Sequence, residues 1–192
     1  MKKIVIILGH PDRESFCAGL ATSYANQAAA QGHELRWLKL GEMKFDPILR
    51  SGYRQRQSLE PDLVRAQEAL LWANHYVFVY PIWWGSMPAL LKGFLDRVFL
   101  PGFAFAYRPK SAFWDKLLSG RSAQLLVTLD TPAWYYRWIY RMPGHNQMKR
   151  TILEWTGVKP VRLAQFGPIR NSSAAQRDRW HGEVAKLARR FR

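Results

Sequence analysis

Two consecutive tryptophans, Trp83 and Trp84, are the side chains of this sequence best suited to contact a planar ligand. They follow an uncharged run of β-branched and aromatic residues that ends at Pro81, and Ile82 and Gly85 flank them. A turn does not need two large aromatic rings. The pair therefore indicates either the wall of a ligand site or a cover over a core or an interface.

A second candidate site precedes the first predicted helix, where the segment Gly9-His10-Pro11 leads to Ser15. Ser15 is a typical helix cap, and the first turn of a helix offers free N–H groups and the positive end of its dipole. This arrangement favours a phosphate, with His10, Ser15 and the amide of Phe16 as donors.

Other chemistries find no support in the residue pattern. Neither G-x-G-x-x-G nor G-x-x-x-x-G-K-[ST] occurs, and the five histidines lack metal-ligand spacing, so we predict no metal site. Ser86 lies in Gly-Ser-Met rather than in the G-x-S-x-G elbow of a hydrolase. The single cysteine, Cys17, excludes an intramolecular disulfide, and we predict that it is a small buried residue.

Predicted strands and helices alternate along the chain. The continuous apolar run 4–8 is typical of a strand buried on both faces of a parallel sheet. The five predicted strands cover residues 4–8, 34–40, 76–81, 122–128 and 161–166. Predicted helices cover residues 16–30, 61–72, 88–99 (with Ser86 as its cap), 147–155 and a last segment capped by Ser172 and Ser173, and residues 103–120 are a predicted loop.

This alternation predicts an α/β fold in which helices cover both faces of a parallel sheet. If the strand order is 2-1-3-4-5, the loops after strands one and three face one crevice at the switch point. Residues 129–146 form an aromatic insert after the fourth strand, where a lid or an interface segment is expected. We expect a single domain over residues 1–192.

The composition bounds the function classes. Hydrophobic residues make up 48% of the chain, and the formal net charge of +15 attracts polyanions. The basic residues are dispersed and accompany no recognised nucleic-acid motif, so we expect no specific nucleic-acid partner. Residues 69–91 carry no charged side chain, but two prolines interrupt them, so we predict no membrane span and a cytoplasmic protein.

Three motifs carry a family resemblance: Gly9-His10-Pro11 through Phe16, then Phe45-Asp46-Pro47, and above all the run from Pro81 to Phe99. Over most of its length the chain resembles the NAD(P)H:quinone oxidoreductase family of flavodoxin-like flavoproteins. The resemblance implies a doubly wound five-stranded sheet and a bound FMN or FAD. It also implies NAD(P)H as co-substrate, a homodimer, and ping-pong, two-electron reduction of quinones or similar acceptors.

Carried over by position, the resemblance also implies the site residues. The flavin phosphates would lie at His10, Ser15 and Phe16, and the ring edge along Pro81, Ile82, Trp83, Trp84 and Gly85, with Thr128, Leu129 and Asp130 in the next contacting loop. Backbone N–H groups of Trp83, Trp84 and Gly85 would stabilise negative charge on the ring.

The sequence departs from the family pattern after the fourth strand. Thr-Leu-Asp-Thr-Pro stands where better-known members have Thr-Thr-Gly-Gly, and the Asp130 carboxylate would either repel an anionic ring or accept from a ring N–H. The family's catalytic tyrosine and histidine would correspond to Tyr136 or Tyr140 and to His145.

Alternative functions stay open on the sequence alone. One is a flavodoxin-like electron carrier, although such carriers are usually acidic. Another is a regulatory or ancillary flavoprotein subunit of the kind found with potassium efflux systems, with the basic surface as its contact.

Overall fold

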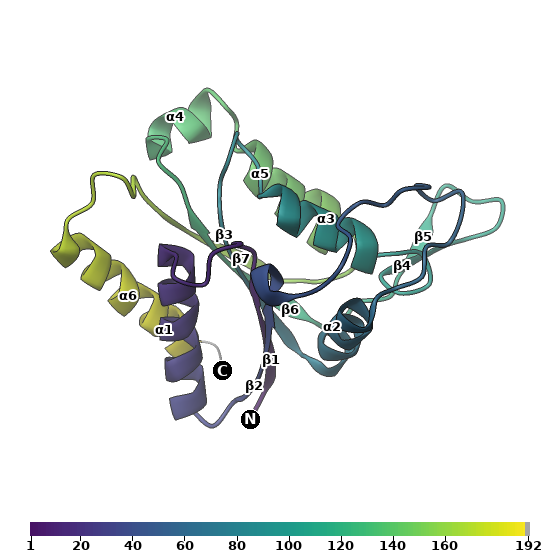
Figure 1. The fold of residues 1–192 in the computed structure, drawn as a ribbon, viewed down its shortest axis with the longest axis horizontal. Coiled ribbons are helices and arrows are strands. Elements are labelled where there is room, and N and C mark those ends of the chain that lie inside the picture. Colours follow the sequence, from purple (N-terminus) through teal and green to yellow (C-terminus); the bar gives the residue numbers. More distant parts are fainter. Residues whose placement is uncertain (191–192) are drawn as a thin grey trace.

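A parallel five-stranded sheet forms the centre of the molecule in the computed structural model, which describes residues 1–190 (Figure 1). Its strands are β1 (Lys3–Leu8), β2 (Glu34–Lys39), β3 (His75–Pro81), β6 (Ser122–Thr128) and β7 (Val161–Phe166). They lie in the order β2-β1-β3-β6-β7, and every adjacent pair is parallel. Counted along the sheet's own strands this is 2-1-3-4-5, which confirms the predicted topology.

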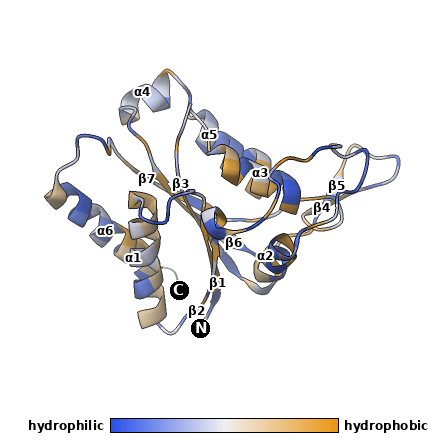
Figure 2. Ribbon diagram, in the orientation of Figure 1, coloured by the Kyte–Doolittle hydropathy of each residue, from blue (hydrophilic) through white to orange (hydrophobic). Residues whose placement is uncertain are grey.

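Helices cover both faces of the sheet. On one face, α1 (Phe16–Ala30) and α6 (Ala174–Arg189) pack against each other and against the strands. On the other face lie α2 (Pro61–Trp72), α3 (Ala89–Val98) and the π-helical segment η2 (Gln147–Leu153). Figure 2 shows the apolar colour concentrated on the strands between these layers. The alternating side chains of each buried strand therefore contribute to two separate cores.

Three of the predicted helix starts are confirmed, and one predicted cap is wrong. Ser15 and Ser173 cap α1 and α6, accepting hydrogen bonds from the N–H groups of Ala18 and Gln176, and α2 begins at Pro61. The predicted cap Ser86 is wrong, because α3 begins at Ala89 after Pro88 and has no side-chain cap.

Ser86 is instead part of the chain that approaches α3. Its backbone pairs with Trp83, and its hydroxyl donates to Gln147 Oε1 at 2.7 Å. These contacts hold it three residues before the first residue of the helix, where no first-turn N–H reaches it.

A small hairpin occupies the segment that was predicted as a loop. β4 (Phe105–Tyr107) and β5 (Trp114–Lys116) pair in antiparallel fashion. The Trp155 ring anchors the hairpin, since it lies 4.6 Å from the Phe105 ring and 4.5 Å from the Trp114 ring, centroid to centroid. Strands of three residues are too short for an alternating pattern to reveal them.

Residues 129–146 contain two short helices, α4 (Ala133–Trp138) and α5 (Pro143–Asn146), and a short 3₁₀ turn, η1 (Leu40–Glu42), follows β2. Cys17 is buried as predicted, and burial raises its pKa to about 11. Among residues 1–190, the structure contains no helix with the length and apolar character needed to cross a membrane.

Candidate functional site

The carboxyl ends of β1, β3 and β6 meet at one edge of the sheet (Figure 1). Gly9 N–H donates to Val79 O at 2.8 Å, and Ile82 N–H donates to Thr128 O at 2.7 Å. Parallel pairing thus continues one residue beyond β1 and β3. It brings the loop after Gly9 and the loop after Pro81 to the same edge, which is where open α/β sheets bind ligands.

The two tryptophans lie in a tight turn. Trp83 N–H donates to Ser86 O at 2.8 Å, and Ser86 N–H donates to Trp83 O at 3.0 Å. The two central residues have positive φ, 49° at Trp84 and 78° at Gly85, as a type I′ turn requires. Glycine adopts this conformation freely, whereas a tryptophan does so at a cost of about 1–3 kcal/mol.

This turn projects aromatic surface from the protein. The Trp84 side chain is fully exposed and 45% of the Trp83 surface is accessible. The turn also changes the expected donor set, because the Trp83 N–H already bonds Ser86. The available amides of the turn are those of Trp84 and Gly85, so the expectation for the Trp83 amide is wrong.

His10 lies against this turn. Its ring centroid is 5.4 Å from that of Trp83, and the two rings meet edge to face at 72°. Asp12 N–H donates to His10 Nδ1 at 2.9 Å. The same Nδ1 lies 3.2 Å from Asp12 O, so the shorter contact with Asp12 N–H assigns Nδ1 as the acceptor. In the neutral tautomer that makes this bond, Nε2 carries the proton and is the donor.

The start of α1 offers backbone donors rather than side-chain donors. The Ser15 hydroxyl donates to Asp12 O at 2.8 Å and accepts from Ala18 N–H, so the loop and the cap already use it. The Phe16 ring packs on the rings of Trp180 and His181 in α6, at 5.9 and 5.3 Å. The groups of α1 that are still available to bind an anion are the N–H groups of its first turn and the positive end of its dipole.

Arg177 is a further cation at this place that the sequence analysis did not identify. Its guanidinium carbon lies 5.7 Å from the centre of the Phe16 ring. Sequence spacing shows only that Arg177 belongs to the polar side of α6. The packing of α6 on α1 decides its position beside the start of α1.

The loop after β6 is closely tied to its neighbours. Thr128 Oγ1 lies 3.2 Å from Cys17 Sγ, and both Thr128 and Leu129 are buried. Leu129 O accepts from Ile169 N–H, and the Asp130 carboxylate accepts from Arg170 N–H at 2.7 Å. The Asp130 carboxylate is thus held toward the chain after β7.

Tyr136 and His145 come together inside the insert. The Tyr136 hydroxyl donates to Gly85 O and accepts from Gly144 N–H, each at 3.0 Å, so it joins the insert to the tryptophan turn. Its ring lies 5.0 Å from the His145 ring. Burial raises the pKa of the Tyr136 hydroxyl, which favours its neutral form.

The His145 side chain is buried and its Nε2 lies 2.9 Å from Gln165 Oε1. Burial lowers its pKa, so the neutral imidazole is favoured near neutral pH. Gln165 and Gly144 could not be assigned to this cluster from the sequence, because only the folded chain brings them to it. Tyr140 lies at the outside, 49% exposed, with its ring 4.9 Å from that of Tyr135.

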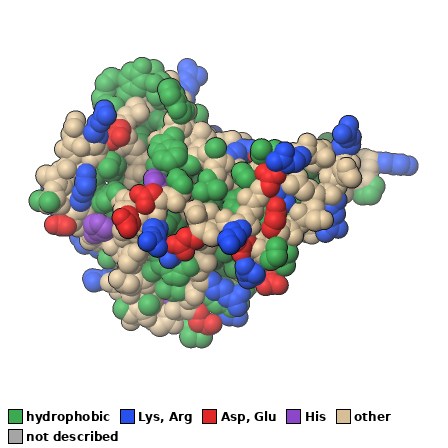
Figure 3. Space-filling model, viewed as in Figure 1, with side chains coloured by type: hydrophobic (Ala, Val, Ile, Leu, Met, Phe, Trp, Pro, Cys, Tyr) green, Lys and Arg blue, Asp and Glu red, His purple; other side chains and the backbone are tan. Residues whose placement is uncertain are grey.

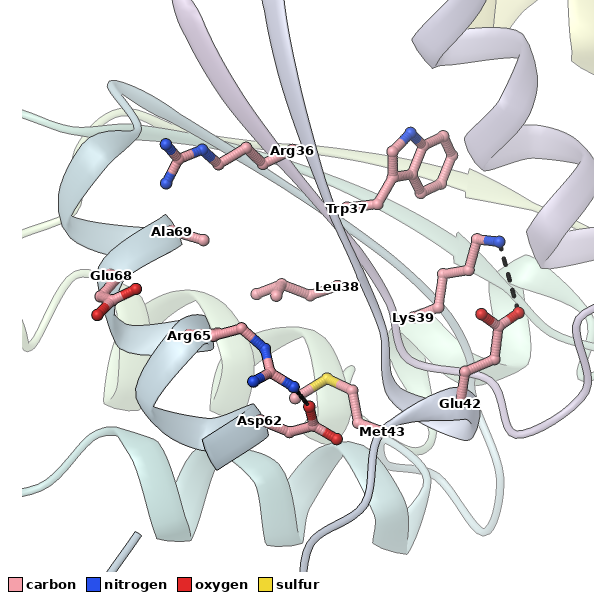
Figure 4. A pocket seen from close by; sticks show the side chains of 10 residues that line it. All are labelled: Arg36, Trp37, Leu38, Lys39, Glu42, Met43, Asp62, Arg65, Glu68 and Ala69. Carbon is pink, nitrogen blue, oxygen red and sulfur yellow. Dashed lines mark hydrogen bonds and ion pairs between the residues drawn. The ribbon is translucent and has the colours of Figure 1, made fainter. Parts of the chain in front are cut away.

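A separate pocket of about 520 Å³ lies between β2 and α2 (Figure 4). Two ion pairs neutralise much of its charge, Lys39 with Glu42 and Arg65 with Asp62. None of the residues that line it belongs to the loops after β1, β3 and β6. Within the described residues no cluster of three or more His, Cys, Asp or Glu side chains is arranged to hold a metal ion.

Comparisons with known proteins agree with this architecture. A family model described as "Flavodoxin-like fold" matches residues 2–190. The crystal structure of Smu.1420 from Streptococcus mutans UA159 is 28% identical, with a TM-score of 0.80 over 98% of this chain and 99% of that one.

Three relatives have informative names. An uncharacterized NAD(P)H oxidoreductase of Haemophilus influenzae is 28% identical over 86% of this chain and 83% of its own length. The human ribosyldihydronicotinamide dehydrogenase [quinone] is 31% identical over 70% of this chain and 66% of its own. The ribosyldihydronicotinamide dehydrogenase-like protein traD of Penicillium crustosum is 29% identical over 66% of this chain, which spans 57% of that protein.

Proposed function

Because the chain belongs to the family with the flavodoxin-like fold, we propose that it is a flavin-dependent NAD(P)H oxidoreductase that reduces quinones or similar acceptors by two electrons. The observation that carries the proposal is the contact of His10 with Trp83, which joins a phosphate-type loop to an aromatic turn at the switch point. The names of the human and Haemophilus influenzae relatives support the reaction class.

The residues of this edge fit a planar, phosphate-bearing group. Trp83 supplies exposed aromatic surface, His10 supplies an Nε2 donor, and α1 supplies first-turn amides beside Arg177. A flavin bound here would accept hydride from NAD(P)H and pass two electrons to the acceptor. We propose FMN or FAD for this role, held within one domain over residues 1–192.

The protein's own groups would bind and orient the ring. The amides of Trp84 and Gly85 are donors on the tryptophan turn and would stabilise negative charge at a ring edge. The Tyr136 hydroxyl holds Gly85 O, so it fixes the direction in which this turn points. Tyr136 is therefore a positioning residue in this proposal, and its own proton stays in place.

His145 and Tyr140 have different parts in the proposal. His145 is neutral and bonded to Gln165, so it donates or accepts a hydrogen bond rather than delivering a proton from an imidazolium. Tyr140, half exposed at the rim, is available to an acceptor molecule. We also infer a homodimer, as the family resemblance implies.

The first experiment is flavin loading. The purified protein is incubated with FMN or with FAD, passed through a desalting column and scanned for flavin absorbance. Loaded protein is then assayed for oxidation of NADH and NADPH with and without a water-soluble benzoquinone. Retention of one flavin and quinone-dependent oxidation are expected, and failure to retain either flavin contradicts the proposal.

A pair of variants locates the site. His10→Ala is expected to weaken flavin retention by about ten-fold, the loss of a hydrogen bond to a charged group. Trp37→Ala, in the pocket of Figure 4, is the matched control and leaves retention unchanged. A loaded protein that transfers electrons to a carrier protein without turning over quinone would instead support the electron-carrier alternative.

A further inference from the structure

Four large apolar side chains are exposed together in the middle of the insert. Trp134, Trp138, Ile139 and Tyr140 are 63, 69, 57 and 49% exposed, and we call them the α4 patch. Figure 1 shows α4 at an outer extremity of the molecule, and Figure 3 shows a cluster of hydrophobic side chains at that place. The α4 patch is thus a protruding surface, unlike the scattered single hydrophobic residues that every protein exposes.

The fold holds the α4 patch in place. Tyr136, in the middle of α4, is fully buried and bonds Gly85 and Gly144. Met142 N–H donates to Tyr136 O at 3.0 Å, and the Asn146 side chain donates to Arg141 O at 2.8 Å. The exposed rings therefore stand on a braced segment and do not collapse onto the protein.

The charged side chains of the segment that carries the α4 patch, residues 131–153, have one sign. No Asp or Glu occurs between Asp130 and Glu154, whereas this interval carries Arg137, Arg141, Lys149 and Arg150. Arg137 and Arg141 are exposed, and the Arg137 guanidinium carbon lies 5.2 Å from the centre of a Trp138 ring. The Asp130 carboxylate at the base of the segment accepts from Arg170 N–H.

We propose that the α4 patch docks this protein on the surface of anionic membranes. Tryptophan and tyrosine rings prefer the headgroup level of a bilayer, and a short aliphatic side chain such as that of Ile139 enters the outer acyl region. Arg137 and Arg141 then face lipid phosphates, and the formal charge of +15 attracts the whole molecule.

Other occupants fit this surface less well. A second copy seated on the same patch would bring its own Arg137 and Arg141 against those of the first, with no carboxylate in the segment to pair with them. Single-stranded nucleic acid also combines cations with aromatic stacking, but it is usually held in a groove, and α4 protrudes. A lipid surface matches a convex patch of rings and arginines.

The docking does not depend on the reaction. If the proposed function also holds, docking would bring the strand-end site close to acceptors dissolved in the bilayer. The two proposals fail separately, because membrane binding is measured without turnover and flavin loading is measured without lipid.

Co-sedimentation with vesicles tests the proposal. Full-length protein is mixed with vesicles of phosphatidylcholine alone or of phosphatidylcholine with phosphatidylglycerol, at low and at high salt. Binding is expected to the anionic vesicles, weaker in high salt. Trp134→Ala/Trp138→Ala is expected to reduce the partition constant by about ten-fold or more, and Arg137→Gln/Arg141→Gln by a similar factor.

Matched controls distinguish binding by the α4 patch from nonspecific adsorption of the protein to vesicles. Phe113→Ala removes an equally exposed aromatic ring, 70% accessible, from the turn between β4 and β5, and Arg54→Gln/Arg56→Gln removes two exposed arginines elsewhere. Both controls should bind anionic vesicles nearly as the parent does. Circular dichroism confirms that each variant is folded.

Four results would overturn the proposal. The first two are no binding to anionic vesicles, and an equal loss of vesicle binding in the patch and control variants. The other two are conversion of a dimer to a monomer by the tryptophan variant in gel filtration, and binding of a single-stranded oligonucleotide that is tighter than vesicle binding and is abolished by the same variant.

Discussion

His75, at the start of β3, is a buried histidine whose two ring nitrogens both contact other side chains. Its Nδ1 lies 2.8 Å from Ser122 Oγ and its Nε2 lies 3.3 Å from the Tyr24 hydroxyl. Burial, reinforced by the nearby charges of Lys2 and Arg162, lowers its pKa to about 3. The folded protein therefore keeps this ring neutral, whereas the unfolded chain protonates it near its ordinary pKa.

This difference predicts a pH dependence of stability. The unfolded state binds the proton first, so the contribution of His75 is complete above about pH 6.5 and declines as the pH falls toward 3. Denaturant unfolding between about pH 6.5 and pH 5, where most carboxylates remain ionised, isolates the histidines. We expect a smaller loss of stability across this window in His75→Gln than in the parent, and equal losses in both would contradict the assignment.

At the scale of elements, a buried arginine joins the segment before α2 to α3. Arg97 in α3 is fully buried and donates to Asp46 O, to Ser58 O and to the Glu60 carboxylate, the last at 2.8 Å. Burial alone would raise the pKa of Glu60, but the bonds from Arg97 and from backbone N–H groups lower it overall. These contacts fix Asp46, Ser58 and Glu60 against α3.

Arg97→Ala should destabilise the protein by about 3–5 kcal/mol, since it removes the cation from the pair with Glu60 and leaves the carbonyl groups of Asp46 and Ser58 without the Arg97 donor. Arg65→Ala is the matched control, because the Arg65–Asp62 pair is largely exposed on the arginine side and should cost less than about 1 kcal/mol. Urea unfolding of both variants gives the comparison, and similar losses would show that Arg97 is not the anchor.

The junction between the tryptophan turn and α5 depends on the absence of a side chain at Gly144. A Cβ at this position would lie 2.9 Å from Gly85 O and 3.0 Å from Ser86 Cα, both backbone atoms. Gly144 thus allows the insert to approach the turn closely enough for Tyr136 to bond both glycines.

Gly144→Ala is therefore expected to destabilise the fold by about 1–3 kcal/mol through overpacking. Gly182→Ala offers the opposite case, because a Cβ there meets nothing within 4 Å in the middle of α6. That substitution should stabilise the protein by about 0.5–1 kcal/mol. Thermal unfolding should show a lower melting temperature for Gly144→Ala and a higher one for Gly182→Ala. Melting temperatures that shift in the same direction would contradict the close packing at Gly144.

At the scale of the whole molecule, the strand-end site draws on both helical layers and on the sheet between them. The loop before α1 and the turn before α3 meet at the carboxyl edge of the sheet, although their helices cover opposite faces, and α6 adds Arg177 from beside α1. A ligand that contacts all of these groups links the layers, so its binding stabilises the fold as a unit.

We therefore expect FMN to raise the free energy of unfolding by about 2.7 kcal/mol at a concentration 100 times its dissociation constant. Riboflavin, which lacks the phosphate, should stabilise less at equal concentration, because it makes no contact with the start of α1. Arg177→Gln should reduce the difference between the stabilisation by FMN and that by riboflavin in a thermal-shift assay. Equal stabilisation by both compounds would place the phosphate elsewhere.

The sequence by itself determined the five strands of the main sheet and the starts of three helices. Three continuous apolar or uncharged runs, before Gly9, Pro81 and Leu129, are typical of strands buried in the middle of a parallel sheet. Ser15 and Ser173 cap helices through local hydrogen bonds, and Pro61 stands at the start of α2. These signals are local, so a pattern within a few residues is enough to read them. The aromatic pair at Trp83 was likewise visible as a candidate site.

The tertiary structure decided which atoms of the site are available. The Trp83 amide and the Ser15 hydroxyl are used internally, Asp130 bonds the chain after β7, and Tyr136 braces the turn. Each of these outcomes depends on partners far apart in sequence or on a turn conformation that strand pairing imposes. Residue type and spacing cannot reveal them. A donor that is already bonded within the protein and a donor that is free to bind a ligand look the same in the sequence.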